Sequence, residues 1–249
     1  MKAIYTIPAA MLLAGSSTAV LAAPQFYLGA QAGYQDTAVE VSGSDTYSDD
    51  VETNSFSFKQ DSYDASGIAG SALAGVKFDV GSNAFVSLEA NIGTSNAEAE
   101  FSDSSSYSYD EGEFSGSGSR SSFQRFESGK TYGIAALAGL EVTPSTSVYA
   151  RLGYQRTEFE YSRGWSSSSE YSDPWGSGSS SDGDSYSEDE SFGGIRYGVG
   201  METAIGERVA VRLDWSQTDY SSEDFDVYDQ TIEIDPTESL FQAGVVYKF

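Results

Sequence analysis

The residues best suited to chemistry are charged side chains that stand singly inside apolar segments. The sequence holds 38 acidic and 13 basic residues but no His and no Cys. Without imidazole, His-dependent hydrolysis and His-rich zinc sites are excluded, and without thiols there are no disulfides or thiolate metal ligands. The charges that could form ion pairs or line an ion path include Lys77, Glu89, Glu141, Arg151, Arg196, Glu202, Arg212 and Asp214.

The elements that position these charges are eight segments in which apolar residues alternate with polar or small ones. In the clearest of them, Ile195, Tyr197 and Val199 share one face, and Arg196 and Gly198 share the other. A period of two indicates a β-strand with two different faces, and about nine to eleven residues let a tilted strand cross a membrane. The segments are residues 26–34, 68–78, 85–93, 132–142, 148–155, 194–205, 208–216 and 240–249.

The connections between these segments alternate between short and long. Three are short and contain the turn-forming residues Gly, Pro, Asn and Ser, namely 79–83, 143–147 and 206–207. The other four hold 32 of the 38 acidic residues and 6 of the 13 basic ones, and they are 35–66, 94–131, 156–192 and 217–238. Outer-membrane barrels have this asymmetry, whereas a soluble β-sandwich has no reason for it. We therefore predict an all-β fold, an eight-stranded antiparallel transmembrane β-barrel with three short periplasmic turns and four long acidic extracellular loops.

The N-terminal residues predict export. Met1 and Lys2 form a short basic start, an apolar stretch follows, and small residues lead to Ala22 and Ala23. This is the pattern of a secretory signal peptide, so we expect residues 1–22 to be removed and residues 23–249 to form a single barrel domain. The mature part has no run of about 18 apolar residues, so membrane-spanning helices are not expected.

Together, the signal peptide, the eight two-faced strands and the final aromatic residue resemble the small eight-stranded outer-membrane barrels of Gram-negative bacteria, of the OmpA and OmpX kind. The resemblance covers the architecture and no diagnostic motif. It implies that the last strand, with Val245, Tyr247 and Phe249 on its apolar face, is the signal read by the barrel assembly machinery. Full-length OmpA continues beyond its barrel, whereas no residue follows Phe249, so we expect no peptidoglycan-binding domain.

The charged residues within the strands lie on the glycine-bearing face, which is expected to point into the barrel. Their cations and anions nearly balance, and buried charges are tolerated only when they are paired. An eight-stranded barrel is just wide enough to be filled by its own side chains. We therefore predict a filled interior with a middle layer of Glu89, Arg151, Arg212 and Asp214 and a lower layer of Lys77, Glu141 and Glu202. The alternative is a gated path for protons or ions.

The charge distribution limits the partners. The net charge is −25 and the isoelectric point about 4.1, so nucleic acid is not an expected partner. Outer-membrane lipids and the barrel assembly machinery are the expected ones. The acidic runs 182–190 and 219–229 could collect divalent cations, which prefer carboxylate oxygens. Aromatic residues in the long segments, among them Trp165 and Trp175, could instead contact an extracellular ligand.

We expect a non-enzymatic outer-membrane protein, without a cofactor or a resident metal, that serves envelope integrity, adhesion or surface recognition through its acidic loops. Known barrel phospholipases, proteases and acyltransferases rely on a catalytic His, which this chain lacks. The alternative function is a small porin or narrow channel for ions or small solutes. That function requires a continuous water path past Arg151, Arg196 and Arg212.

Overall fold

The computed structural model describes residues 23–48, 53–227 and 230–249, and it describes side chains for residues 23–39, 64–222 and 235–249. The predicted signal peptide, residues 1–22, lies outside the described residues. Within the described part of the chain, no helix has the length and hydropathy needed to cross a bilayer.

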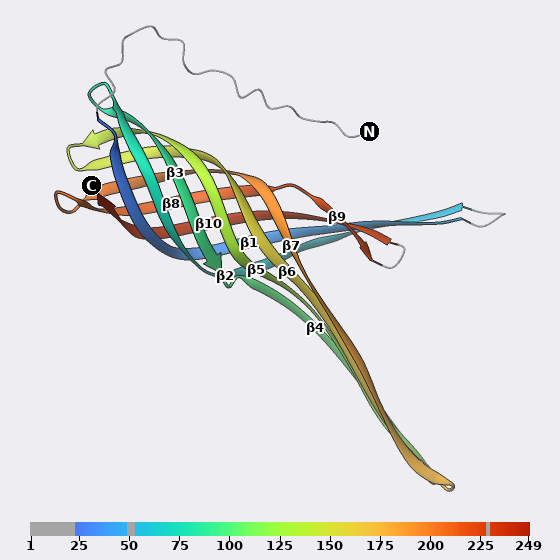
Figure 1. Ribbon diagram of the computed structural model, residues 1–249. Coiled ribbons are helices and arrows are strands. Elements are labelled where there is room, and N and C mark those ends of the chain that lie inside the picture. The colour runs from blue at the N-terminus through green and yellow to red at the C-terminus, as the bar shows by residue number, and fades with distance from the viewer. Residues whose placement is uncertain (1–22, 49–52, 228–229) are drawn as a thin grey trace.

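The described residues form ten strands, and the sheet they make closes on itself because β1 pairs with both β2 and β10. Eight strands make the closed ring, in the order β1, β2, β3, β5, β6, β7, β8 and β10 (Figure 1). The other two, β4 and β9, pair mainly with β5 and with β10. The strands are β1 (Gln25–Ser48), β2 (Thr53–Val80), β3 (Ala84–Ser95), β4 (Glu98–Glu111), β5 (Phe114–Thr143), β6 (Thr146–Asp173), β7 (Gly176–Ala204), β8 (Val209–Tyr220), β9 (Glu223–Val227) and β10 (Gln230–Lys248).

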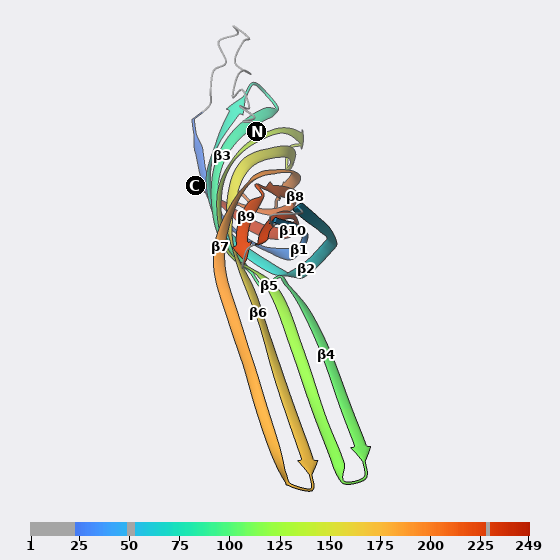
Figure 2. The same ribbon diagram turned by 90° about the vertical axis from the view of Figure 1, so that its right-hand side faces the viewer.

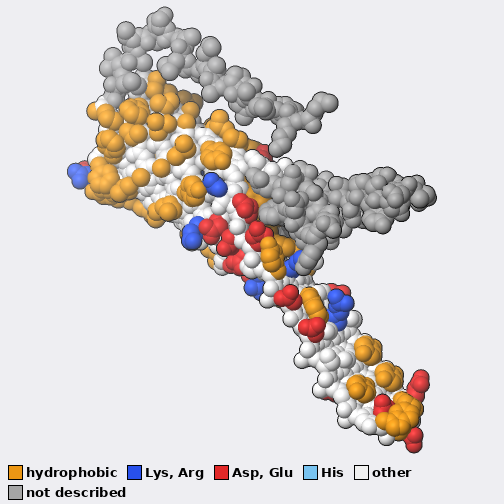
Figure 3. All heavy atoms as spheres, turned by 45° about the vertical axis from the view of Figure 1, so that its right-hand side comes forward, with side chains coloured by type: hydrophobic (Ala, Val, Ile, Leu, Met, Phe, Trp, Pro, Cys, Tyr) orange, Lys and Arg blue, Asp and Glu red, His pale blue; other side chains and the backbone are white. Residues whose placement is uncertain are grey.

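The predicted strands and turns of the barrel are confirmed. Each of the eight alternating segments falls on a different strand of the ring and extends at most one residue beyond it, and the three predicted short turns join β2 to β3, β5 to β6 and β7 to β8. Exposure also alternates as predicted: on β8, Val211, Leu213 and Trp215 are exposed, whereas Arg212 and Asp214 are buried. The barrel therefore has an apolar outer surface, visible in Figure 3, around a polar interior.

The long connections differ from expectation, because they are mostly strand and not loop. The strands β5, β6 and β7 run far past the rim of the barrel, where β4 joins them at the edge (Figures 1 and 2). In these stretches Ser, Gly and acidic residues occupy both faces, so the sequence shows no apolar face and its period of two is lost. The backbone ladder nevertheless continues, pairing Glu98 to Glu111 with β5 and Ser115 to Ser128 with β6.

We call residues 98–127 and 160–190, the part of β4 to β7 beyond the barrel, the projecting sheet. It ends in two tight turns, at residues 111–114 and 173–176. Gly112 has a φ of 73°, a backbone conformation that favours glycine. The carboxylate of Asp173 accepts hydrogen bonds from the backbone N–H of Trp175 at 2.8 Å and of Gly176 at 2.9 Å, which fixes the second turn.

Candidate functional site

The described side chains of the barrel interior lie in successive layers, and β6 gives the order of these layers. Going from the short turns toward the rim, its inward residues include Tyr149, Arg151, Gln155, Thr157 and Phe159, all of them buried. They belong in turn to a charged cluster, a hydrogen-bonded cluster and an aromatic cluster.

The four residues assigned to the middle layer lie together as one ion-pair cluster. Arg151 Nη2 lies 2.6 Å from Glu89 Oε1, and Arg212 Nη1 lies 2.6 Å from Glu89 Oε2. Asp214 Oδ1 lies 3.7 Å from Arg151 Nη2 and accepts a hydrogen bond of 2.7 Å from the Tyr149 hydroxyl. Because these charges are almost fully buried, their attraction is little screened by water.

The residues assigned to the lower layer divide into two groups. Glu202 belongs to the charged cluster, since its Oε2 lies 2.9 Å from Arg212 Nη2 and its Oε1 lies 2.7 Å from Lys248 Nζ. Lys77 and Glu141 form a separate pair, 3.1 Å apart, whose carboxylate is exposed. With Lys248 included, the charged cluster contains three cations and three anions, so its formal charge is zero.

Two tyrosine rings enclose Arg212. Its guanidinium carbon is 5.3 Å from the centroid of the Tyr27 ring and 5.4 Å from that of the Tyr149 ring, distances at which the ring faces attract a cation. Two glycines make room for the rings. A Cβ added to Gly75 would lie 2.3 Å from the Tyr27 ring, and one added to Gly200 would lie 2.3 Å from the Tyr149 ring.

Arg196 lies apart from the other predicted charges, in a hydrogen-bonded cluster nearer the rim. It donates to Gln155 Oε1 at 2.7 Å and to Ser216 Oγ at 3.0 Å. Gln155 Nε2 in turn donates to Glu238 Oε1 at 3.1 Å, and the Tyr220 hydroxyl donates to Glu238 Oε2 at 2.8 Å. A neutral amide thus connects the buried guanidinium to the buried carboxylate.

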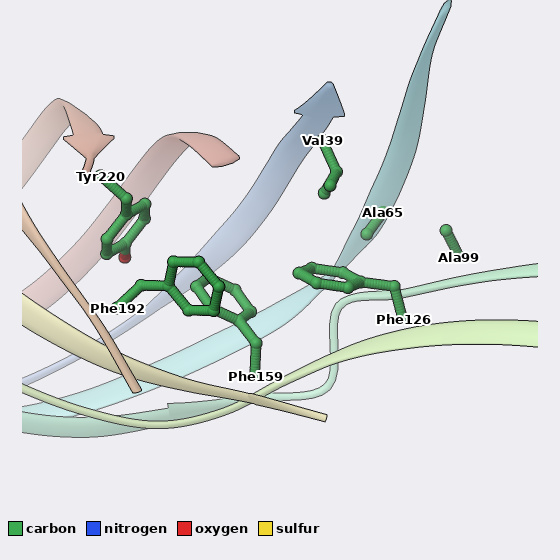
Figure 4. Packing of buried hydrophobic residues seen from close by; sticks show 7 residues of the cluster. All are labelled: Val39, Ala65, Ala99, Phe126, Phe159, Phe192 and Tyr220. Carbon is green, nitrogen blue, oxygen red and sulfur yellow. The ribbon is translucent and has the colours of Figure 1, made fainter. Parts of the chain in front are cut away.

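An aromatic cluster covers these polar layers at the rim. The Phe159 ring lies 5.0 Å from the Phe126 ring, 5.5 Å from the Phe192 ring and 5.4 Å from the Tyr220 ring, measured between centroids. Figure 4 shows these side chains approaching one another, and Val39 belongs to the same buried cluster. Phe159 and Phe192 are only 2% and 1% exposed, so the cluster closes the interior at this end.

Two small cavities lie within the interior. Each has a volume of about 10 Å³, which is room for about one water molecule. One is lined by Asn91, Arg196 and Gln242 among others, and the second by Lys77 and Glu202 among others. Neither of these two spaces is large enough to form a water path by itself.

Two members of the hydrogen-bonded cluster, Tyr220 and Glu238, fall in a segment predicted as loop, so they are not among the predicted interior residues. The signal that could have identified Glu238 is its position. It lies two and four residues before Leu240 and Gln242, so it shares their inward face of β10. The alternation of the sequence places Tyr27 and Tyr149 on the inward face, but nothing in the sequence pairs them with Arg212.

Val245, Tyr247 and Phe249, the residues of the predicted assembly signal, lie together on the outer face of the barrel. All three are exposed, and the rings of Tyr247 and Phe249 meet edge to face with centroids 5.2 Å apart. The backbone N–H of Phe249 donates to the carbonyl of Phe26 at 3.0 Å. The end of β10 is therefore paired with β1 up to this residue.

The closed ring of eight strands with an apolar exterior agrees with the family comparison. The family model described as outer membrane protein beta-barrel domain matches residues 8–249. The chain belongs to this family. As an outer-membrane β-barrel, it lies in the outer membrane with the apolar face of its ring against lipid.

Solved structures similar to this outer-membrane β-barrel include three small outer-membrane proteins. Ail, the attachment invasion locus protein of Yersinia pestis, is 12% identical, with 87% of this chain and 99% of that chain covered and a TM-score of 0.33. OprG from Pseudomonas aeruginosa is 12% identical, with 90% and 95% covered and a TM-score of 0.40. Neisserial surface protein A is 12% identical, with 90% and 97% covered and a TM-score of 0.29. No curated protein sequence gives a significant match.

The first acidic run that sequence analysis assigned to divalent cations lies on an exposed stretch of β7. Asp182 and Asp184 each accept a hydrogen bond of 2.9 Å from the backbone N–H of the residue that follows. Among the residues that the structure describes, no group of three or more carboxylates is placed to hold a metal ion. Residues 228–229 of the second run lie outside that part of the chain.

Proposed function

We propose that this barrel anchors a stiff acidic β-sheet at the cell surface, where the sheet serves recognition or adhesion. The observation that carries the proposal is the continuity of β5, β6 and β7, each of 28 to 30 residues, from the periplasmic turns to the far end of the projecting sheet. A barrel that needed only to span the membrane would not need strands of this length. The neutral, filled interior suits an anchor.

We also propose that the protein is not an enzyme. The buried charges are paired with one another or hydrogen-bonded to neighbouring polar side chains, and the aromatic cluster separates them from the outside. A substrate arriving from the extracellular side would not reach them. The exposed carboxylates of the projecting sheet have no His to act with, since the sequence contains none.

The test of surface recognition removes the projecting sheet and keeps the barrel. Residues 101–124 and 163–186 are each replaced by Asn-Gly, a two-residue hairpin turn. The new turns join Glu100 to Arg125 and Ser162 to Ser187, which are already opposite each other in the sheet. We expect normal insertion, seen as heat-modifiable gel mobility, and loss of cell attachment to a panel of beads coated with lysozyme, albumin or dextran. Attachment equal to that of the parent would contradict the proposal.

The rival function, a narrow channel, is tested by planar-bilayer conductance of the purified protein. The ion-pair cluster, the one-water cavities and the aromatic cluster favour a closed interior, so we expect no steady conductance. Steady open steps that disappear when Arg151 or Arg212 is replaced would favour the channel. The variant lacking the projecting sheet is the control, because opening the rim alone should not create a path through the ion-pair cluster.

We further propose that Val245, Tyr247 and Phe249 are read by the barrel assembly machinery during insertion. Their support is the shared outer face of β10 and the edge-to-face contact between the two aromatic rings. A side chain on this face is accessible to a protein that guides the strand before lipid surrounds it.

A further inference from the structure

The far end of the projecting sheet carries a group of exposed aromatic side chains. They come from both hairpins, and their exposed fractions run from 45% for Phe114 to 85% for Trp175. Figure 3 shows hydrophobic side chains gathered at this end, with acidic side chains beside them. We call the group the distal aromatic face, and it consists of Tyr107, Tyr109, Phe114, Tyr171 and Trp175.

The strand register places the tyrosines of this group on one face. Tyr109 is opposite Gly116, Gly116 is opposite Tyr171, and Tyr171 is opposite Gly178, so this row crosses all four strands. Residues directly opposite each other in an antiparallel sheet share a face. The row therefore alternates a tyrosine with a glycine twice.

The glycines let the tyrosine rings lie flat on the sheet. A Cβ added to Gly116 would lie 2.6 Å from the Tyr109 ring, and one added to Gly178 would lie 2.6 Å from the Tyr171 ring. Tyr107 covers Gly118 in the same way, at 2.5 Å. A ring that lies against its neighbouring strand presents its other flat side outward, so the row offers aromatic faces and not ring edges.

Contact between the two hairpins completes the surface. The rings of Phe114 and Trp175, which stand at the two turns, have centroids 6.1 Å apart and planes tilted by 56°. The distal aromatic face is thus one surface shared by β4, β5, β6 and the second turn.

The charge next to this surface is mostly negative, although Arg120, two residues beyond Gly118 on β5, lies on the same face as the tyrosines. Residues 105–119 and 166–181 contain five acidic residues and no basic ones. Of these acids, Glu111 and Asp173 share the face of the tyrosines and Glu113 lies in the first turn, whereas Asp110 and Glu170 lie on the opposite face. A negative potential of this kind repels anionic ligands and attracts cations.

Aromatic faces and carboxylates together make a surface for cationic side chains. The face of a tyrosine or tryptophan ring attracts a guanidinium or ammonium group, and a neighbouring carboxylate adds a charge-assisted hydrogen bond. The carboxylates of Glu111, Glu113 and Asp173 would add little to the binding of a neutral saccharide. We propose that the distal aromatic face binds Arg- and Lys-rich segments of a partner protein. This inference rests on the proposed recognition function and names the chemistry of its partner.

The binding test uses the full chain in lipid nanodiscs and a short peptide of alternating Arg and Gly, measured by calorimetry at low and high salt. We expect binding that weakens with salt, and no binding of the same peptide with citrulline in place of Arg. The double variant Tyr109→Ser and Tyr171→Ser should bind about tenfold more weakly, since each lost cation–π contact contributes roughly 0.5 to 1 kcal/mol at an exposed site.

The control is Ser117→Ala with Ser172→Ala, on the opposite face of β5 and β6, and it should bind like the parent. Equal loss in both double variants, or no loss in either, would mean that general acidity and not the aromatic face binds the peptide. Tighter binding of maltoheptaose than of the Arg peptide would also overturn the proposal in favour of a saccharide site.

Cell-attachment assays distinguish failure of the aromatic binding site from failure of the proposed recognition function. If the variant without the projecting sheet loses attachment to lysozyme-coated beads and the tyrosine double variant loses it too, both stand. If only the variant without the sheet loses attachment, surface recognition stands and the aromatic site is wrong. Heat-modifiable gel mobility checks that each variant has folded.

Discussion

Gly75 and Gly200 decide how closely two tyrosine rings can approach Arg212. Each glycine lies under a ring that would be 2.3 Å from an added Cβ, a separation that packed atoms do not tolerate. Both rings lie within 5.4 Å of the Arg212 guanidinium carbon, and its N–H groups donate to Glu89 and Glu202. At the scale of single residues, Gly75 and Gly200 thus make room for the two tyrosine rings that lie beside Arg212.

Gly200→Ala should therefore destabilise the barrel by roughly 1 to 3 kcal/mol, the range expected for overpacking. The measurement is urea unfolding of the protein refolded in lipid vesicles. Gly70→Ala is the control, because the nearest heavy atom to its added Cβ is 3.9 Å away and the new methyl group has room. Equal unfolding midpoints for the two variants would show that Tyr149 moves aside without cost.

Arg212→Met should cost about 3 to 5 kcal/mol, since it leaves Glu89 and Glu202 buried with fewer partners. The same urea titration measures the effect. Arg208→Met removes an exposed arginine whose contact with the Tyr247 hydroxyl is 3.4 Å long, so it should change stability little. A small effect at Arg212 would mean that the remaining cations rearrange to compensate.

Like charges face one another where the projecting sheet leaves the barrel. Glu98 is opposite Glu127, Glu127 is opposite Glu160, and Glu160 is opposite Asp189, so four carboxylates cross the sheet in one row. Directly opposite like charges destabilise a sheet. At the scale of elements, the long backbone ladders of β5 with β6 and of β6 with β7 must offset this repulsion.

Glu127→Gln should accordingly stabilise the projecting sheet, by roughly 0.2 to 1 kcal/mol, because it removes repulsion on two sides. Slower proteolysis of the projecting sheet in folded protein would report the change, and added salt should reduce the difference between variant and parent. Glu170→Gln is the control, since the residues opposite Glu170 are Ser117 and Ser179. Equal protection by both substitutions would point to total charge and not to the row.

The sequence allows the barrel to be predicted better than the sheet that extends from it. Alternation such as that of Val211, Arg212 and Leu213 is enforced by lipid on one side and a filled interior on the other, so it can be read directly. The projecting sheet has water on both faces, and Ser166, Ser167 and Ser168 carry no period that could reveal a strand. The backbone ladder defines the sheet there, together with hydroxyl pairs between strands such as Ser121 with Ser166.

The sequence predicts which charged residues point into the barrel, but it does not predict which of them form pairs. The outward and inward positions follow from parity, which places Glu89, Arg151 and Arg212 on the same side of the sheet. Which of them meet depends on how the strands are staggered around the ring, and a single sequence does not specify that stagger. For this reason Arg196 lies with Gln155 and Glu238, while Glu202 lies with Lys248.

At the scale of the whole molecule, the pairing of β1 with β10 closes the sheet into a barrel. Phe249→Ser should slow assembly several-fold in vesicles that contain the assembly machinery, because it removes one of the two aromatic rings from the outer end of β10. Phe26→Ser is the control: this exposed aromatic residue is at the same end of the barrel but on β1. Equal assembly rates for the two variants would indicate that any exposed aromatic residue at this end of the barrel matters, and not a signal in β10.

The unbroken course of β5, β6 and β7 also determines how the molecule would bear mechanical load. Residues 114 to 128 of β5 extend about 50 Å at the rise of an extended strand. A pull on a ligand held at the far end would run along the strands, while the hydrogen bonds between them lie across that direction. Many bonds would then resist together in shear, instead of opening one after another as in a hairpin peeled from its end. The force would pass into the barrel along its own strands, and the barrel would hold these strands in the membrane.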